Sequence, residues 1–218
     1  MRAKSFLHVS FGVVIFAVTL PVATGAQPPP AFITAWGSLG SGPGQFNFPA
    51  GMATDVAGNV YVADEFNSRI QKFTSTGTYL TQWGSHGTGN GQFINPSDVA
   101  TDAAGNVYVM DGTNNRVQKF TDTGTYLTQW GSYGSGDGQF QIPVALTTDA
   151  DGNVYVGDYD RIEKFTGTGT YLTQWGRPGR GNGEFDFLIG LATDAAGNVY
   201  AVDQYNYRIQ KFTGTGTY

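Results

Sequence analysis

The sequence predicts an all-β protein, a β-propeller of four blades with four strands in each blade, and three observations support that prediction. One segment is repeated four times, at 32–78, 79–125, 126–170 and 171–217. Each copy contains four short runs that are β-branched, aromatic and alternating, separated by Gly, Asn, Asp and Ser. Nothing in 32–218 has helical periodicity over a useful length. Four antiparallel strands per repeat of this length are typical of one propeller blade.

The four runs of the first full unit give the expected order of strands within a blade. They are Gly51–Asp55, Asn59–Asp64, Arg69–Phe73 and Tyr79–Trp83. We expect them to follow one another outward from the central axis, because the small residues of the first run suit the crowded centre. The Trp of each fourth run is expected to cover the outer edge of the layer between blades rather than to form a binding platform, since every copy has it. These residues are Trp36, Trp83, Trp130 and Trp175.

Two repeated sets of acidic residues are predicted to fix turns. The first set ends the innermost run and is expected to cap the following turn through its carboxylate. It contains Asp55, Asp102, Asp149 and Asp194. The second set brackets the turn between the second and third runs together with an arginine, an arrangement that suits a bidentate ion pair. These structural turn pairs are Asp64 with Arg69, Asp111 with Arg116, Asp158 with Arg161, and Asp203 with Arg208.

The two ends of the repeat region leave the closure of the ring open. Residues 33–37 have the pattern of a fourth run but are not preceded by the other three runs. The last blade, at 188–217, has the first three runs and no fourth. If 33–37 completes that blade, the four-bladed ring closes, no strand edge is exposed, and we expect a monomer. The alternative is an open fragment of a larger propeller, which we expect to self-associate through its edges.

The first 31 residues are outside the repeats and predict export. Arg2 and Lys4 precede an apolar run from Phe11 to Leu20, and small residues follow at 24–26. This pattern is typical of a secretory signal peptide at 1–26, and a Pro-rich spacer follows at 27–31. The predicted location is extracellular or periplasmic, and an uncleaved N-terminal membrane anchor is the alternative.

Charge excludes two classes of partner for the mature chain. Residues 27–218 contain 10 basic and 17 acidic residues, a net charge of −7. This argues against a nucleic-acid partner, whose phosphates require a basic face, and against binding to an anionic membrane surface. The chain has no cysteine, so it has neither disulfides nor thiolate metal sites.

The repeated motifs resemble the NHL repeat over the whole of 32–218. The pattern consists of Gly-[Met/Leu]-Ala-Thr-Asp, then Gly-Asn-Val-Tyr-Val-Ala-Asp, then Asn-x-Arg-[Ile/Val]-Gln-Lys-Phe, then Gly-x-Gly-x-Gly-Gln-Phe. Three copies match in full, with Asp64, Asn67 and Arg69 as the first set. The third copy departs, because two residues are deleted and the Asn is absent between Asp158 and Arg161.

The resemblance implies a propeller and leaves several functions open. NHL propellers commonly have six blades, so the number of blades is the main departure. Similar proteins include interaction platforms, among them RNA-binding and extracellular sensor domains, and a few enzymes such as lactonases and lyases. A His-bound metal, as in similar amidoglycolate lyases, is not expected here, because His86 is the one histidine after the predicted signal peptide. We therefore predict no cofactor.

Binding is predicted on the face that carries the loops between the second and third runs. These loops differ between copies while the scaffold does not, and variable loops on a rigid scaffold are a common place for binding. The candidate ligand-binding residues are Phe66, Asn67, Asn114, Tyr159, Tyr205, Asn206 and Tyr207. The aromatics would supply stacking area and the amides hydrogen bonds.

Three hypotheses about function follow. We favour a secreted or cell-surface binding scaffold that recognises a protein or a glycan without catalysis. The second is a lactonase- or lyase-type enzyme that uses a divalent metal, with Asp98 as a weak metal candidate, because Asp98 stands where the other copies have Gly51, Ala145 and Gly190. The third is a truncated array without independent activity.

Overall fold

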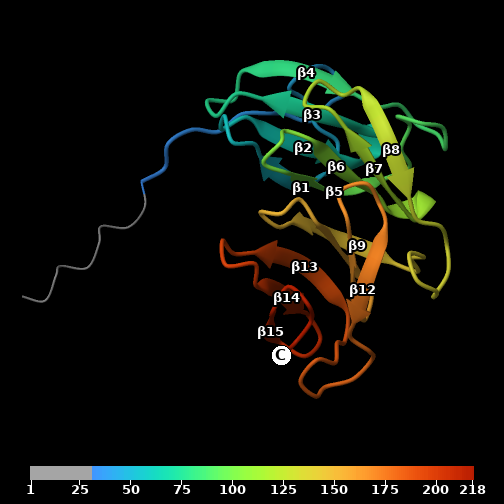
Figure 1. Cartoon of the computed structure of the whole chain (residues 1–218). Helices are drawn as coiled ribbons and strands as arrows, with labels where there is room; N and C mark the ends of the chain where they lie inside the picture. Colours follow the sequence, from blue (N-terminus) through green and yellow to red (C-terminus); the bar gives the residue numbers. More distant parts are fainter. Residues whose placement is uncertain (1–30) are drawn as a thin grey trace, which may run out of the picture. The chain divides into compact units, whose positions relative to one another are not determined.

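The computed structural model describes residues 31–218, of which 34–218 form one compact unit. The predicted signal peptide and almost all of the spacer lie outside the described residues. The unit is all-β and consists of four antiparallel blades arranged as a β-propeller, as the repeats predict. The blades follow one another in chain order, from the blue-green first sheet through green and orange to the red last sheet (Figure 1).

Each blade is built from consecutive strands that lie where the alternating runs predict them. The first blade has β1 (Pro49–Thr54), β2 (Val60–Asp64), β3 (Arg69–Phe73) and β4 (Tyr79–Trp83). The second has β5 (Pro96–Thr101), β6 (Val107–Asp111), β7 (Arg116–Phe120) and β8 (Tyr126–Trp130). The third has β9 (Pro143–Thr148), β10 (Val154–Asp158), β11 (Arg161–Phe165) and β12 (Tyr171–Trp175). The fourth has β13 (Leu188–Thr193), β14 (Val199–Asp203) and β15 (Arg208–Phe212). Two 3-10 turns, Glu65–Asn67 and Gly112–Asn114, lie between β2 and β3 and between β6 and β7.

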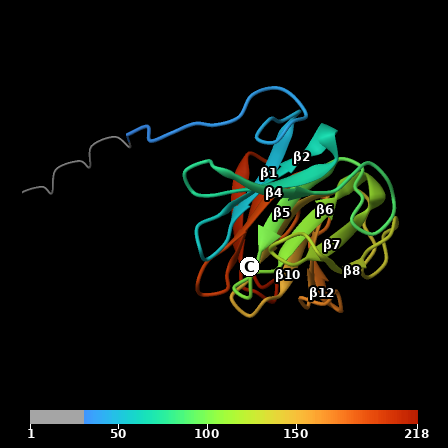
Figure 2. The same cartoon turned by 90° about the horizontal axis from the view of Figure 1, so that it is seen from above.

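The innermost strands of successive blades pack side by side around a central axis. β1 contacts β5, β5 contacts β9, and β9 contacts β13. In both views β1 lies beside β5 (Figure 1, Figure 2). The sheets run from β1 outward to β4 in sequence order, which confirms the predicted order of strands. A short hairpin between antiparallel neighbours needs no crossover, and this is why each repeat folds into one blade.

Apolar side chains between neighbouring blades form the core. Tyr61 and Ile70 of the first blade are fully buried against Val109 and Phe120 of the second. Trp83 covers the outer part of this layer, with its ring centroid 5.8 Å from that of Phe120. Burying a side chain of this size stabilises a fold by about 1.5–3 kcal/mol. The predicted structural role of the Trp set is confirmed by these contacts.

A glycine admits each Trp ring. Gly124 has a φ of +89°, and a Cβ there would come within 2.6 Å of the Trp83 ring. The turn therefore needs glycine for its backbone conformation and for the space that the indole occupies.

The carboxylates that end the innermost strands cap the next turn, as predicted. Asp55 accepts hydrogen bonds from the backbone N–H groups of Ala57 and Asn59, at 3.0 and 2.8 Å. Tyr61 Oη also donates to Asp55, at 3.0 Å, and Lys72 Nζ lies 5.0 Å from the centre of the Tyr61 ring. This arrangement recurs in every blade and fixes the end of the propeller opposite the loops considered below.

The last blade keeps three strands, and residues 34–37 are not in a strand. Of the two alternatives for the ring, the described residues therefore show the open one. Trp36 packs instead on Phe73 of the first blade, because that ring and Gly77 offer the same apolar seat that Phe120 and Gly124 offer to Trp83. Ile209 of β15 is left 62% exposed.

Candidate functional site

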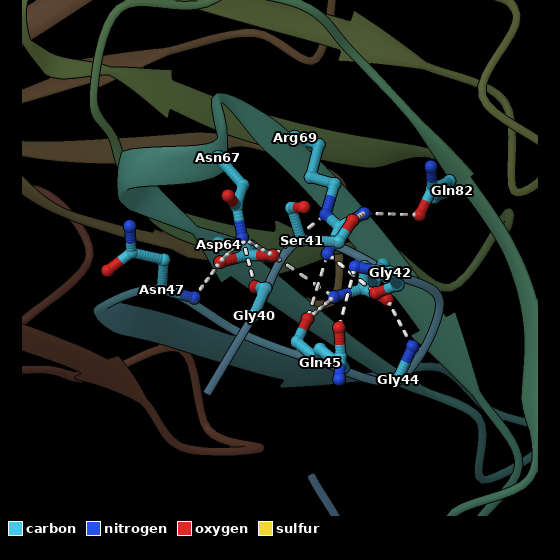
Figure 3. Close-up of polar contacts among 11 residues, drawn as sticks. Gly40, Ser41, Gly42, Gly44, Gln45, Asn47, Asp64, Asn67, Arg69 and Gln82 are labelled. Atoms are coloured by element: carbon cyan, nitrogen blue, oxygen red, sulfur yellow. Dashed lines mark hydrogen bonds and ion pairs between the residues drawn. The ribbon is translucent and has the colours of Figure 1, made fainter. Parts of the chain in front are cut away.

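Two kinds of loop meet at one end of the propeller, which we call the loop face. The first kind joins the second strand of each blade to the third, and the second kind joins the last strand of one blade to the first strand of the next. An ion pair with several hydrogen bonds ties the two kinds together in each blade, and Figure 3 shows it for the first blade.

The Asp64–Arg69 pair uses its hydrogen-bonding groups within the protein. Arg69 Nε donates to Asp64 Oδ2 at 2.7 Å, and Asn67 Nδ2 donates to both oxygens of the same carboxylate. The backbone N–H of Asn47 donates to Asp64 Oδ1 at 2.7 Å, and Arg69 Nη2 donates to the carbonyl of Gln45 at 2.8 Å. Both side chains are buried. The pair therefore fixes one loop to the other and presents no free charge to a ligand.

The same ion pair forms in the other blades. Asp111 and Arg116 approach to 2.8 Å, as do Asp203 and Arg208. Burial alone would raise the pKa of the Asp203 carboxyl, but hydrogen bonds from a backbone N–H and from Arg208 hold that pKa below its usual value. In the third blade the distance between Asp158 and Arg161 is 3.1 Å, and the Asn that completes the network elsewhere is absent.

One position of this network holds a neutral amide in three blades and an acid in the remaining one. Three blades have a buried glutamine in the third strand, and β11 has Glu163 at that position. The glutamines are Gln71, Gln118 and Gln210. Gln118 accepts a hydrogen bond through Oε1 and donates through Nε2 to the carbonyl of Gln92, at 2.7 Å, and to Asp111, at 3.2 Å. An amide therefore suits a site that needs both an acceptor and a donor.

Glu163 supplies the acceptor but not the donor. Its Oε2 accepts from the backbone N–H of Gly138 at 2.8 Å. Its Oε1 lies 3.0 Å from Arg161 Nη2 without hydrogen-bond geometry, because that nitrogen donates to the carbonyl of Gln139 and to Asp158. Burial raises the pKa of Glu163 to about 7. The third blade thus contains a buried acid that takes up a proton near neutral pH.

Asp98 lies in the central cavity, which has a volume of about 470 Å³ and is lined by the innermost strands of all the blades. Its carboxylate accepts hydrogen bonds from the backbone N–H groups of Val99 and Leu146, both at 2.8 Å. A Cβ at Gly51 would overlap this carboxylate. Burial raises the pKa of Asp98 to about 6. Asp98 therefore links β5 to β9 and packs closely against β1, and its role as a metal ligand stays a prediction.

The predicted aromatic residues are exposed on the loop face. Phe66 is 55% exposed and stacks on Phe48, with ring centroids 4.9 Å apart. Tyr205 stacks on Phe187 at 5.6 Å, and Tyr159 meets the same ring edge-on at 5.8 Å. The chain therefore holds two aromatic clusters, one in the first blade and one between the third and fourth.

A further candidate, Tyr207, is 93% exposed and has a φ of +54°, a conformation that is unusual for a bulky residue. Tyr159, with a φ of +55°, begins the shorter loop of the third blade, which consists of Tyr159 and Asp160. Backbone strain of this kind collects at functional sites when the surrounding structure holds it.

The predicted amide residues are mostly engaged with the protein itself. Asn67 Nδ2 donates to Asp64 and to the carbonyl of Gly40. Asn114 and Asn206 make the equivalent bonds to the acidic residue of their own blades. The structure therefore separates the aromatic candidates, which face solvent, from the amides, which brace the loops.

A shallow pocket lies on the loop face between the first three blades. Its volume is about 390 Å³, and polar side chains dominate its lining. Glu65, Asn95, Asn115, Tyr133 and Gln141 contribute to it. Burial raises the pKa of the Glu65 carboxyl.

The described residues contain neither a metal-binding cluster nor a membrane-spanning helix. No group of three or more His, Cys, Asp or Glu side chains within 31–218 is placed to hold a metal ion. In the same part of the chain, no helix is long and apolar enough to cross a membrane.

Comparison with known families matches the repeats directly. The model of the NHL repeat matches residues 46–73 and 93–120, which are the corresponding parts of the first two blades. The chain is an NHL-repeat β-propeller. No curated protein shows significant similarity to the sequence.

Solved structures similar to this NHL propeller have larger chains. A streptogramin B lyase matches with a TM-score of 0.60 at 16% identity, over 78% of this chain and 52% of its own. A catalytically inactive virginiamycin B lyase from Staphylococcus aureus with quinupristin matches with a TM-score of 0.54 at 16% identity, over 76% and 55% of the two chains. A protein of unknown function from Bacteroides thetaiotaomicron matches with a TM-score of 0.60 at 19% identity, over 75% and 46%. At these identities the likeness concerns the fold, and the chain spans about half the length of these proteins.

The NHL propeller is thus a rigid scaffold whose fold suits binding. Sequence reasoning missed Phe48 and Phe187, which form the inner halves of the two aromatic clusters. A signal for them existed, because the same position holds Asn95 and Ile142 in the other blades, so it varies as the loops do.

Proposed function

We propose that this chain is a secreted or cell-surface binding scaffold that recognises a protein or glycan partner through its loop face. The observation that carries the proposal is the pairing of exposed aromatic rings on loops that buried ion pairs hold in place. Phe66 on Phe48 and Tyr205 on Phe187 present flat apolar surfaces to solvent. Aromatic side chains with few rotatable bonds give contact area at low entropic cost.

The remainder of the loop face supports recognition by hydrogen bonds. The pocket of about 390 Å³ beside the first aromatic cluster offers amide and hydroxyl groups of Asn95, Asn115 and Tyr133. A concave polar site next to exposed aromatics fits a partner with both hydroxyl or amide groups and an apolar face. Secretion is part of the proposal and is supported by the signal-peptide pattern at 1–26.

The proposal is tested with arrays of glycans and of extracellular proteins, probed with the labelled wild-type chain. A variant with Phe66, Tyr159, Tyr205 and Tyr207 replaced by Ala should lose each signal of the wild type by at least about tenfold, since truncation of one aromatic hot spot costs about 2 kcal/mol or more. The matched control replaces the exposed outer-strand residues Leu80, Leu127 and Leu172 by Ala and should bind normally. Equal loss in both variants, or full binding by the first, would refute the proposed face.

A second candidate function is a metal-assisted lactonase- or lyase-type enzyme. It is favoured by the position of the Asp98 carboxyl in the central cavity, and lyases occur among proteins of similar fold. Calorimetry with calcium, zinc and manganese at millimolar concentration tests it. Binding that Asp98→Ala removes would support this candidate, and the absence of binding by all three ions would end it.

A further inference from the structure

The two terminal blades leave opposite faces partly uncovered. Within the propeller each blade packs one face, here called the trailing face, against the next blade, and its other face, the leading face, against the blade before. Ile209 lies on the trailing face of the last blade and is 62% exposed. Its equivalents in the other blades, Ile70, Val117 and Ile162, are all 0% exposed. Met52 lies on the leading face of the first blade and is also 62% exposed, against 2% for Val99 and 4% for Leu146.

The two uncovered faces are complementary because the blades are near copies of one another. Ile70 on a trailing face packs in one cluster with Phe93, Val99 and Val109 from the leading face of the next blade. The first blade has Phe46, Met52 and Val62 at the three corresponding positions. Met52 is exposed, whereas Val62 is already buried in a cluster that Trp36 and Phe46 cover. An apolar surface that matches Ile209 is therefore already built at the other end of the chain.

Polar groups follow the same pattern. The hydroxyl of Thr101 donates to the carbonyl of Thr54 at 2.8 Å, Thr148 donates to Thr101 at 2.7 Å, and Thr193 donates to Thr148 at 2.6 Å. Within residues 31–218 the series ends with the hydroxyl of Thr54 on the leading face and the carbonyl of Thr193 on the trailing face. A further contact of the same kind would join these two groups.

Trp36 lies where the Trp of a preceding blade would lie. Trp83 belongs to β4, pairs with Ile70 in its own sheet, and packs on Phe120 of the next blade. Trp36 packs on Phe73 in the same way, at 6.1 Å, but residues 34–37 pair with no strand of the described chain. The sheet that lacks a fourth strand is the last one, whose outer edge is β15.

We propose that the trailing face of the last blade binds the leading face of the first blade of a second copy of this chain. Residues 34–37 of that copy would then add the fourth strand to the edge of β15, an example of strand addition. Such an interface is heterologous, so it forms a closed ring or an open filament. Two copies joined head to tail would bring eight blades together, and the second junction, identical to the first, would close the ring.

The solution mass of the purified chain tests this proposal by sedimentation velocity over a range of concentrations. We expect a dimer that does not grow further. Ile209→Asp and Met52→Asp each place a charge on one face at an exposed position, so both variants should fold, which circular dichroism checks. Each should weaken the dimer at least about tenfold, because each disrupts both contacts of the ring. Leu127→Asp, at an exposed site on the outer strand β8, is the matched control and should remain dimeric.

Mixing the two variants is the decisive step. The intact trailing face of Met52→Asp meets the intact leading face of Ile209→Asp, so the mixture should form a heterodimer through that one contact at concentrations at which neither variant associates alone. A wild-type chain that stays monomeric, a mixture that stays monomeric, or a control that dissociates equally would overturn the proposal.

Discussion

Glu163→Gln restores in the third blade the residue that the other blades have, and its effect on stability should depend strongly on pH. Burial raises the pKa of Glu163 from its usual 4.5 to about 7. The folded protein therefore binds one more proton than the unfolded chain between these values, and it loses stability as the pH rises through this window. The difference of about 2.5 in pKa corresponds to about 3 kcal/mol once Glu163 is ionised. The glutamine variant has no such loss.

The assay is denaturation by urea at pH 5 and pH 8. At pH 5 the protonated acid and the amide should give similar free energies of unfolding, and at pH 8 the variant should be more stable by up to about 3 kcal/mol. Gln118→Glu is the matched control and should lose stability as the pH rises, because Arg116 Nη2 already donates to two carbonyl groups. A constant difference between wild type and Glu163→Gln at both pH values, or a smaller one at pH 8, would show that Glu163 does not take up a proton on folding.

Substitutions at Asp98, Arg116 and Trp83 test three other features of the scaffold through their effect on stability. Burial raises the pKa of Asp98 to about 6, so the wild type should lose stability as the pH rises from about 4 to 6. Asp98→Ala should not show this loss, and denaturation at pH 4 and pH 7 compares the two proteins. Arg116→Ala should cost about 3–5 kcal/mol at pH 7, since it leaves the buried Asp111 carboxylate without its cation, and a smaller loss than 1 kcal/mol contradicts that role. Trp83→Ala should lower stability by about 3 kcal/mol in calorimetry, whereas the exposed Leu80→Ala should change it little.

Repetition made most of the scaffold predictable. The order of strands, the seat of the Trp rings and the caps formed by Asp55 and its equivalents each depend on residues that recur in every copy. A recurring residue has one physical role in each blade, so its role can be inferred from spacing and residue type alone. The replacement of glutamine by Glu163 was also visible in the sequence as a break in the repeat, but its proton chemistry depends on where Arg161 points.

Features that occur once were not predictable in the same way. Whether 33–37 completes the last blade depends on the curvature with which the blades pack, and no local pattern encodes that. Asn67 and its equivalents were predicted to contact a ligand, because the sequence does not reveal that their amides already donate to the acidic residue of the blade and to backbone carbonyls. The aromatic partners Phe48 and Phe187 became visible only when the loops were placed together.

The most direct test of binding through the loop face is hydrogen–deuterium exchange of the chain with and without the strongest partner from the arrays. We expect slower exchange on binding only in the loops at 65–68, 112–115, 159–160 and 204–207 and in their neighbours in the pocket. Protection that centres instead on the opposite end, at the turns after Asp55, Asp102, Asp149 and Asp194, would contradict it.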